Sequence, residues 1–266
     1  MRAAVESWRV ISASRRVDLV AGYPEELAEI LAARCPPEST HTIVIWTKDP
    51  RNLLEHRVLR AALARYAQLF VHVTITGLGG SALEPRAPEP AQVLRLLPRL
   101  IDFVGMPERI RVRFDPIVHI RFAGGEEICN LGYFAELAPQ LHELGLREVT
   151  TSWLSIYPKV SRRLARIGAV ARDPSPQEWQ EEAAWLVREA GRWGLKLHGC
   201  CVPGWPRSRC IDGELLTRLH PQKLPASQRK AKGQRALCGC TESWDIGWYV
   251  KCVLGCRYCY ANPLDV

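Results

Sequence analysis

The sequence predicts an α/β fold in which six strand–helix units form a parallel sheet and a cysteine-rich extension follows. Two observations support this prediction. In the first 200 residues, short β-like runs alternate with helical patterns, and eight of the ten cysteines lie after residue 199. Strands that alternate with helices imply a parallel sheet, which is closed or partly closed into a barrel, or doubly wound.

The expected strands are short, rich in β-branched and aromatic residues, and apolar on both faces, as buried parallel strands are. They are residues 8–14, 41–47, 69–76, 109–117, 148–156 and 195–202. In the expected helices, apolar residues recur at spacings of three and four, which builds a stripe that faces the core. The helices are residues 24–34, 52–66, 90–104, 131–145 and 177–193.

After residue 203 the sequence changes character. Proline, glycine and basic residues replace the periodic pattern, and one short helix is expected near residues 212–219. We therefore expect residues 203–266 to form an extension of the α/β unit rather than a continuation of its alternation.

Polar side chains follow the expected strands at the points where the strands end. In a barrel, functional residues gather at the carboxyl ends of the strands. The candidates for catalysis are Arg15, Arg16, Asp18, Lys48 and Asp115, and the candidates for cofactor contact are Thr47 and Arg113. Arginine and lysine suit carboxylate or phosphate groups, and Asp115 suits a ribose or a cationic amine. Asp115–Pro116 also fits a simple turn or helix cap.

Composition narrows the class of protein. The chain has 266 residues with an apolar fraction of 47%, which is ample for a large core. No apolar run reaches the ~18 residues of a membrane span, and the first residues lack the apolar region of a signal peptide. We therefore expect a cytoplasmic protein with no membrane partner. The net charge of +8 is compatible with binding to nucleic acid. Because the basic residues are spread along the chain, however, a protein that is basic without binding nucleic acid is favoured.

In a reducing cytoplasm, clustered cysteines bind metal or do chemistry more often than they form disulfides. Cys252, Cys256 and Cys259 are spaced C-x3-C-x2-C, and three thiolates leave one position open on zinc or on one iron of a cluster. A second metal site, for zinc or an auxiliary iron–sulfur cluster, is expected from four further cysteines; the alternative is that they are small buried hydrophobes. These four are Cys200, Cys210, Cys238 and Cys240, while Cys35 and Cys129 are interpreted as structural.

The stretch CVLGCRYCY, residues 252–260, resembles the cluster loop of radical S-adenosylmethionine enzymes, whose pattern is C-x3-C-x-aromatic-C. The resemblance implies that Cys252, Cys256 and Cys259 hold a 4Fe–4S cluster whose fourth iron chelates S-adenosylmethionine. It also implies that Tyr258 packs near the adenine. The implied activity also requires an external electron donor, such as flavodoxin or ferredoxin. It produces a 5′-deoxyadenosyl radical, which abstracts hydrogen from a substrate of unknown identity. In most of that superfamily the loop follows the first strand, whereas here it follows the last unit.

A resemblance to the domain of unknown function 1848 family covers nearly the full chain. It is carried by SRRVD (14–18), WTKDP (46–50), the Glu84–Pro85 pair, RFDPI (113–117), CIDG (210–213) and the ending CGCTESWDIGWYVKCVLGCRYCYAN (238–262). That family usually has Cys-Ala-Glu at the end of the sixth strand. Here Cys200 is followed by Cys201 and Val202, so the glutamate is absent.

These patterns together predict a partial (β/α)6 TIM-like barrel over residues 1–202. Residues 203–266 are expected to fold over the barrel mouth and carry the cluster loop, as part of one structural unit. The expected function is that of a radical S-adenosylmethionine enzyme. The alternative is a zinc-binding, nucleic-acid-associated protein without redox chemistry, in which the same cysteines hold zinc and the basic charge meets phosphate.

Overall fold

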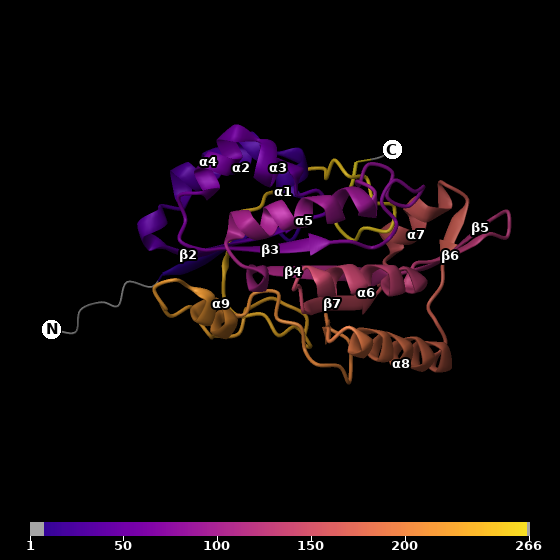
Figure 1. Cartoon of the computed structure of the whole chain (residues 1–266). Coiled ribbons are helices and arrows are strands. Elements are labelled where there is room, and N and C mark those ends of the chain that lie inside the picture. The colour runs from indigo at the N-terminus through magenta and orange to yellow at the C-terminus, as the bar shows by residue number, and fades with distance from the viewer. Residues whose placement is uncertain (1–7, 265–266) are drawn as a thin grey trace.

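The computed structural model describes residues 8–264, and its centre is a seven-stranded parallel sheet (Figure 1). The strand order is β10-β1-β2-β3-β4-β7-β9. The strands are β1 (Arg9–Ala13), β2 (Thr40–Thr47), β3 (Leu69–Thr74), β4 (Ile110–Ile117), β7 (Glu148–Trp153), β9 (Lys196–Gly199) and β10 (Trp244–Asp245). The α/β prediction is confirmed, and each of the six expected strands is present.

The sheet is open, with β10 at one edge and β9 at the other, and these two strands do not pair within the described residues. From β1 to β9 the strands follow one another in chain order without a reversal. A doubly wound sheet reverses its strand order near the middle, so that alternative does not apply.

The helices lie close to the expected positions. They include α2 (Pro24–Arg34), α5 (Pro90–Val104), α6 (Phe134–Glu143), α8 (Pro176–Arg192) and α9 (Gly213–Leu219). The helix expected over 52–66 is divided into α3 (Arg51–Glu55) and α4 (Arg57–Leu63). The division occurs because His56 is extended and its Nδ1 accepts the Leu59 N–H at 3.3 Å, which starts a new helix.

Some elements were not expected from the sequence. Two short helices, α1 (Leu19–Gly22) and α7 (Pro158–Ala165), follow β1 and β7. A small antiparallel sheet has the order β6-β5-β8 and consists of β5 (His119–Phe122), β6 (Glu127–Cys129) and β8 (Ala169–Ala171). Gly124 and Gly125 lie in the turn between β5 and β6. Three 3-10 turns complete the set: η1 (Pro37–Ser39), η2 (Pro107–Arg109) and η3 (Leu131–Tyr133).

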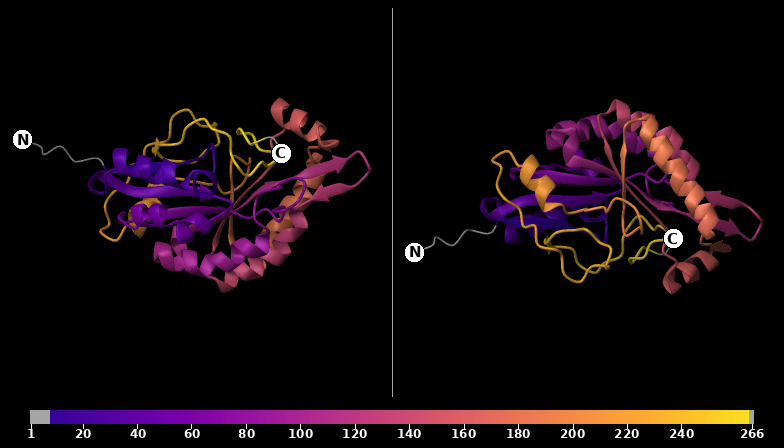
Figure 2. Two further views of the ribbon diagram at one scale, coloured as in Figure 1. Left: turned by 90° about the horizontal axis from the view of Figure 1, so that it is seen from above. Right: turned by 90° about the horizontal axis from the view of Figure 1, so that it is seen from below.

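The two faces of the large sheet are covered by different parts of the chain. Ile43 and Ile45 of β2 point into the main core with the helices, whereas Val44 points into a second core with Ile211 and Leu216 of the C-terminal extension. This alternation is the period of two along a strand. Figure 2 shows the same division, with α5, α6 and α8 along one side and the orange-to-yellow extension along the other.

The C-terminal extension is also part of the sheet, because β10 pairs with β1 in parallel. Ser12 and Ser14 of the β1 segment each donate a side-chain hydrogen bond of 3.2 Å to the carboxylate of Asp245. Residues 1–7, at the start of the region that we expected to lack a signal peptide, lie outside the described part of the chain. Among the described helices, none has the length and apolarity needed to cross a bilayer.

Candidate metal and cofactor site

The segment with the C-x3-C-x2-C spacing, residues 252–262, is here named the cysteine loop. Its ends are joined by backbone hydrogen bonds, because the Cys252 N–H donates to the Asn262 carbonyl and the Leu264 N–H donates to the Cys252 carbonyl, both at 2.8 Å. Between them, the Cys259 N–H donates to the Cys256 carbonyl at 3.2 Å. Gly255 has a φ of 65°, a left-handed conformation that glycine adopts without strain. The loop is therefore a closed, compact turn.

The cysteine loop lies against the segments that follow β1 and β3. The Arg257 N–H donates to the Leu83 carbonyl at 2.9 Å, and the Tyr260 hydroxyl donates to the Arg15 carbonyl at 2.8 Å. The backbone N–H groups of Asp18 and Leu254 donate to the thiol of Cys252. The three cysteines are thus placed beside residues that follow the carboxyl ends of the strands.

Burial governs the ionisation of the three thiols. It raises the pKa of Cys252 to about 11, and it also raises the pKa of Cys256 and of Cys259. These thiols keep their protons at neutral pH unless a metal cation displaces the protons, because a metal-bound thiol is deprotonated. The Ala261 N–H donates to Cys259 Sγ at 3.3 Å. Soft sulfur ligands that accept backbone N–H bonds fit an iron–sulfur cluster.

Lys48 and Glu84 form a buried ion pair beside the cysteine loop. Lys48 Nζ lies 2.8 Å from Glu84 Oε1, and Glu84 is only 2% exposed. The same oxygen accepts hydrogen bonds from Thr76 Oγ1 at 2.7 Å and from the Tyr258 hydroxyl. Burial alone would lower the pKa of Lys48, but the charge of Glu84 outweighs it and raises the pKa. Lys48 therefore carries its positive charge next to the thiols.

Asp18 and Thr47 hold the ends of β1 and β2 together. The Asp18 carboxylate accepts from the Ala21 N–H at 3.0 Å, from Thr47 Oγ1 at 3.0 Å and from the Lys48 N–H at 2.8 Å. Burial raises the pKa of Asp18 to about 6 despite these bonds. Asp18 thus positions Lys48 and, through its own N–H, Cys252.

Four further cysteines lie near the ends of β4 and β9, on the face of the sheet that the C-terminal extension covers. They are here named the second cysteine group and are Cys200, Cys210, Cys238 and Cys240. The thiols of Cys200 and Cys240 both hydrogen-bond with Cys210, and Cys238 hydrogen-bonds with Cys240. The bond with Cys200 contributes most to a pKa of Cys210 well below the usual thiol value. The bond with Cys240 lowers the pKa of Cys238 to about 6. The same bonds raise the pKa of Cys200 and of Cys240, so the group favours thiolates at Cys210 and Cys238 and protonated thiols at Cys200 and Cys240.

Arginines surround the second cysteine group. Arg113 Nη1 donates to Cys210 Sγ at 3.0 Å, and Arg235 Nη2 lies 3.5 Å from Cys200 Sγ. The charge of Arg15 acts on both Cys238 and Cys240. Within the described chain, Nε and Nη2 of Arg15 are buried without a hydrogen-bond partner, and its guanidinium lies over the Trp46 ring, 5.4 Å from the centroid. These cations compensate negative charge on the sulfurs.

The Arg113 guanidinium is also paired with Asp115, whose other oxygen accepts a hydrogen bond from the Ser152 hydroxyl. Tyr260 lies between the two groups of cysteines: it is 55% exposed, and the groups close enough to act on its phenol include Cys259, Arg113, Asp115 and Cys200. The cysteine loop and the second cysteine group are therefore neighbours.

The structure separates the predicted site residues into two sets. Asp18, Thr47, Lys48 and Tyr258 lie with the cysteine loop, whereas Arg15, Arg113 and Asp115 lie with the second cysteine group. Arg16 is exposed and lies over the ring of Tyr249, with 4.9 Å to the centroid. Tyr258 is 4% exposed and packs against a core that contains Leu78 and Leu83. Its contact with adenine stays a prediction.

Sequence reasoning gave no site role to Glu84, Arg235, Tyr260 or Arg163, which contact these two groups. For Glu84 the sequence contains a signal, because the Glu84–Pro85 pair after the third strand is one of the motifs that carry the family resemblance. Arg163 is half-buried on α7, a helix that was not expected, and it donates to the carbonyls of Cys256, Arg257 and Cys259. Nothing in its sequence neighbourhood indicates that contact.

Comparison with known proteins identifies a family, although no curated protein matches the chain. The profile of the domain of unknown function DUF1848 matches residues 24–261, which leaves out β1 but includes both groups of cysteines. A match of this length shows family membership, and the protein therefore belongs to the DUF1848 family.

Proposed function

We propose that this protein is an iron–sulfur enzyme of the radical S-adenosylmethionine type. The observation that carries the proposal is the position of the cysteine loop. Its three thiols lie beside Asp18, Lys48 and Glu84, which follow the first three strands of the parallel sheet. In barrels of parallel strands this edge is where chemistry is done.

The donor set of the cysteine loop fits a cluster with one open iron. Three soft thiols are available, and backbone N–H groups point at Cys252 and Cys259. Three protein thiols leave one coordination position open, which fits the open iron of such a cluster.

When bound, the 4Fe–4S cluster and S-adenosylmethionine supply a 5′-deoxyadenosyl radical that abstracts a hydrogen atom, after reduction by a donor such as flavodoxin or ferredoxin. The protein's own residues position and shield these groups. Lys48 places a buried positive charge beside Cys256 and Cys259, which offsets the negative charge of thiolates. Arg113 and Thr47 are proposed to contact the cofactor. Asp115 and Arg15 are proposed to contact the substrate, and Arg15 brings unpaired N–H groups for an anionic part of it.

The open sheet, in this proposal, is the partial barrel that the sequence predicts, with the cysteine loop closing its mouth. Helices cover one face of the sheet and the C-terminal extension covers the other, and Cys256 and Tyr258 of the cysteine loop are buried. Burial of this kind would help to keep water away from a radical intermediate, which needs such protection against side reactions.

The second cysteine group is proposed to hold a second metal centre, either zinc or an auxiliary iron–sulfur cluster. The support is the pair of arginine side chains that donate to its sulfurs. Arg113 and Arg235 direct charged N–H groups at Cys210 and Cys200, which would stabilise negative charge on these sulfurs. Metal binding fixes thiolates in this state.

The test is anaerobic reconstitution with iron and sulfide, followed by metal analysis of three variants. Replacing Cys252, Cys256 and Cys259 together by serine is expected to remove about four irons per chain. Replacing the second cysteine group by serine is expected to remove the remaining metal and leave those four. Cys35→Ser, which changes a buried cysteine outside both groups, should keep all of the metal. Unchanged iron in the cysteine-loop variant would contradict the proposal.

A further inference from the structure

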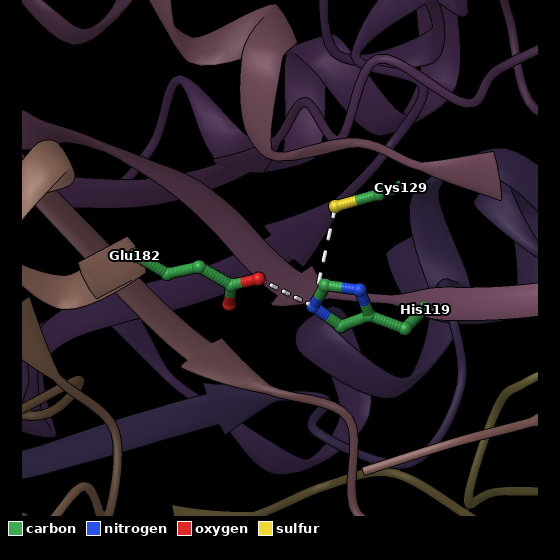
Figure 3. Close-up of side chains that lie close together, drawn as sticks. All are labelled: His119, Cys129 and Glu182. Carbon is green, nitrogen blue, oxygen red and sulfur yellow. Dashed lines mark hydrogen bonds and ion pairs between the residues drawn. The ribbon is translucent and has the colours of Figure 1, made fainter. Parts of the chain in front are cut away.

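Three metal-ligand side chains meet at the small antiparallel sheet, away from both groups of cysteines. Figure 3 shows His119 between Cys129 and Glu182. His119 Nε2 lies 2.9 Å from Glu182 Oε1 and 4.0 Å from Cys129 Sγ. Among the described residues, this is the group whose three ligand atoms all lie within 4.8 Å of one another.

The backbone fixes two of these side chains relative to each other. His119 on β5 and Cys129 on β6 are direct partners in the antiparallel register. Directly opposed residues point to the same face of a sheet, with Cβ atoms about 5 Å apart. The ten-residue separation in sequence therefore becomes a contact through the hairpin turn at Gly124 and Gly125.

The third side chain, Glu182, comes from α8 and is held in place by a hydrogen bond. Trp153 Nε1, at the end of β7, donates to Glu182 Oε2 at 2.6 Å, which leaves Oε1 directed at His119. Metal-binding carboxylates are commonly oriented by such a second contact. Nearby Glu127 and Glu178 are both paired with Arg172, so their charges are already compensated.

We propose that His119, Cys129 and Glu182 form a binding site for a divalent cation of the zinc class. Nitrogen, thiolate and carboxylate ligands together suit Zn²⁺, with bonds of about 2.0–2.3 Å. Three protein ligands leave a fourth position for water, and exposed Cys129 leaves that side open to solvent. The ion would join the β5–β6 hairpin to α8, two elements that are far apart in the sequence. The sequence favours a structural role for Cys129, but its side chain is exposed and faces His119.

The competing state of the same three residues is an ion pair without metal. Hydrogen bonds with Cys129 and Glu182 raise the pKa of His119 to about 10. A proton on Nε2 therefore occupies the position that the cation would take, and metal binding must release it. The experiment has to separate these two states.

The test is zinc titration of the intact, cluster-loaded protein, with zinc and iron measured on the same samples. The unsubstituted chain is expected to bind one more zinc per chain than Cys129→Ser or Glu182→Gln. The matched control is Glu181→Gln, which removes an exposed carboxylate from the next position on the same helix, and it should retain the extra zinc. Iron should be the same in all four proteins, so that failure here is distinguishable from failure of the proposed function.

A second measurement, of the unfolding temperature, keeps the test decisive if one of the variants folds poorly. Zinc should raise the unfolding temperature of the unsubstituted protein and of Glu181→Gln, because a ligand that binds only the folded state stabilises it. The same zinc should leave Cys129→Ser unchanged, and this exposed substitution should not itself disturb folding. Equal zinc content and equal temperature shifts in all four proteins would overturn the proposal and leave the ion pair as the role of the three residues.

Discussion

Glu84 holds together three of the side chains around the cysteine loop. It accepts from Lys48, Thr76 and Tyr258 at one carboxylate oxygen while almost fully buried. Glu84→Gln would leave the Lys48 ammonium buried without a counter-charge. Breaking a buried pair from one side costs about 3–5 kcal/mol. We expect a loss of this order in the free energy of unfolding, measured by urea denaturation under anaerobic conditions.

The control for that substitution is Glu55→Gln. Glu55 pairs with Arg99 at 3.3 Å, but both side chains are more than half exposed. Surface pairs contribute about 0–1 kcal/mol, so this variant should remain close to the unsubstituted protein. Equal losses in the two variants would show that the Lys48–Glu84 pair is not buried as described.

His220 gives the molecule a predictable dependence on pH. Burial lowers its pKa from 6.5 to about 4, helped by the charges of His41 and Arg109. Above pH 6.5 the imidazole is neutral in both the folded and the unfolded chain. As the pH falls from 6.5 towards 4, the unfolded chain takes up a proton that the folded chain refuses, so stability decreases. Between pH 7 and pH 5 the expected loss from this group is about 2 kcal/mol.

The check is the difference in unfolding free energy between these two pH values for His220→Gln and the unsubstituted protein. The variant should lose about 2 kcal/mol less on acidification, although it is less stable at pH 7 because the ring packs 4.6 Å from that of His41. The same acid sensitivity in both proteins would contradict the assignment.

At the scale of elements, α7 positions the cysteine loop. Arg163 Nη1 lies 3.4 Å from the Cys256 carbonyl and 3.3 Å from that of Arg257, and Nη2 lies 2.5 Å from that of Cys259. Arg163→Ala should therefore loosen the loop without removing a sulfur. Loss of a residue that orients metal ligands typically costs about 10–100-fold in metal affinity. We expect iron to be lost at least about tenfold more readily to a chelator under anaerobic conditions.

Arg162→Ala is the matched control, because Arg162 is the exposed neighbour on the same helix. Chelation kinetics for this variant should follow those of the unsubstituted protein. If both variants lose iron at the unsubstituted rate, α7 does not position the cysteine loop.

The junction between β10 and β1 is tested by Gly247→Ala. A Cβ at this position would lie 1.9 Å from Ser14 Oγ, so β10 or the β1 segment must move. Such overpacking costs about 1–3 kcal/mol. The Ile246 N–H, which donates to the Ser12 carbonyl at 3.0 Å, should exchange with deuterium faster in the variant. The control is Gly191→Ala on α8, where an added Cβ meets open space, so the free energy of unfolding should rise by up to about 1 kcal/mol. Unchanged exchange at Ile246 in Gly247→Ala would contradict the described junction between β10 and β1.

The sequence predicts the long elements well because their patterns are local. The apolar stripe of α5 predicts a helix over Pro90–Val104, as the structure has it, and β2 over Thr40–Thr47 is an almost continuously buried strand. β10 could not be predicted, because Trp244 and Asp245 become a strand only by pairing with β1, more than 200 positions earlier. The β5–β6 hairpin could not be predicted, because its strands have only four and three residues, too few for an alternating pattern to stand out.

At the scale of the whole molecule, the candidate site depends on contacts that spacing cannot reveal. The C-x3-C-x2-C spacing predicts a ligand loop, and the strand-end positions of Lys48 and Asp115 predict neighbours for it. Tyr260, which lies between the two groups of cysteines, has no signal of its own. Such residues become visible only when the C-terminal extension lies against the sheet, because the chain segments involved are remote in sequence.

The central claim is that the cysteine loop holds a cluster that acts on S-adenosylmethionine. The most direct measurement is product analysis after the anaerobically reconstituted protein is incubated with S-adenosylmethionine and a strong reductant. We predict a brown protein that forms 5′-deoxyadenosine, and no product when Cys252, Cys256 and Cys259 are serine. A colourless protein that keeps stoichiometric zinc after reconstitution and forms no 5′-deoxyadenosine would contradict the account.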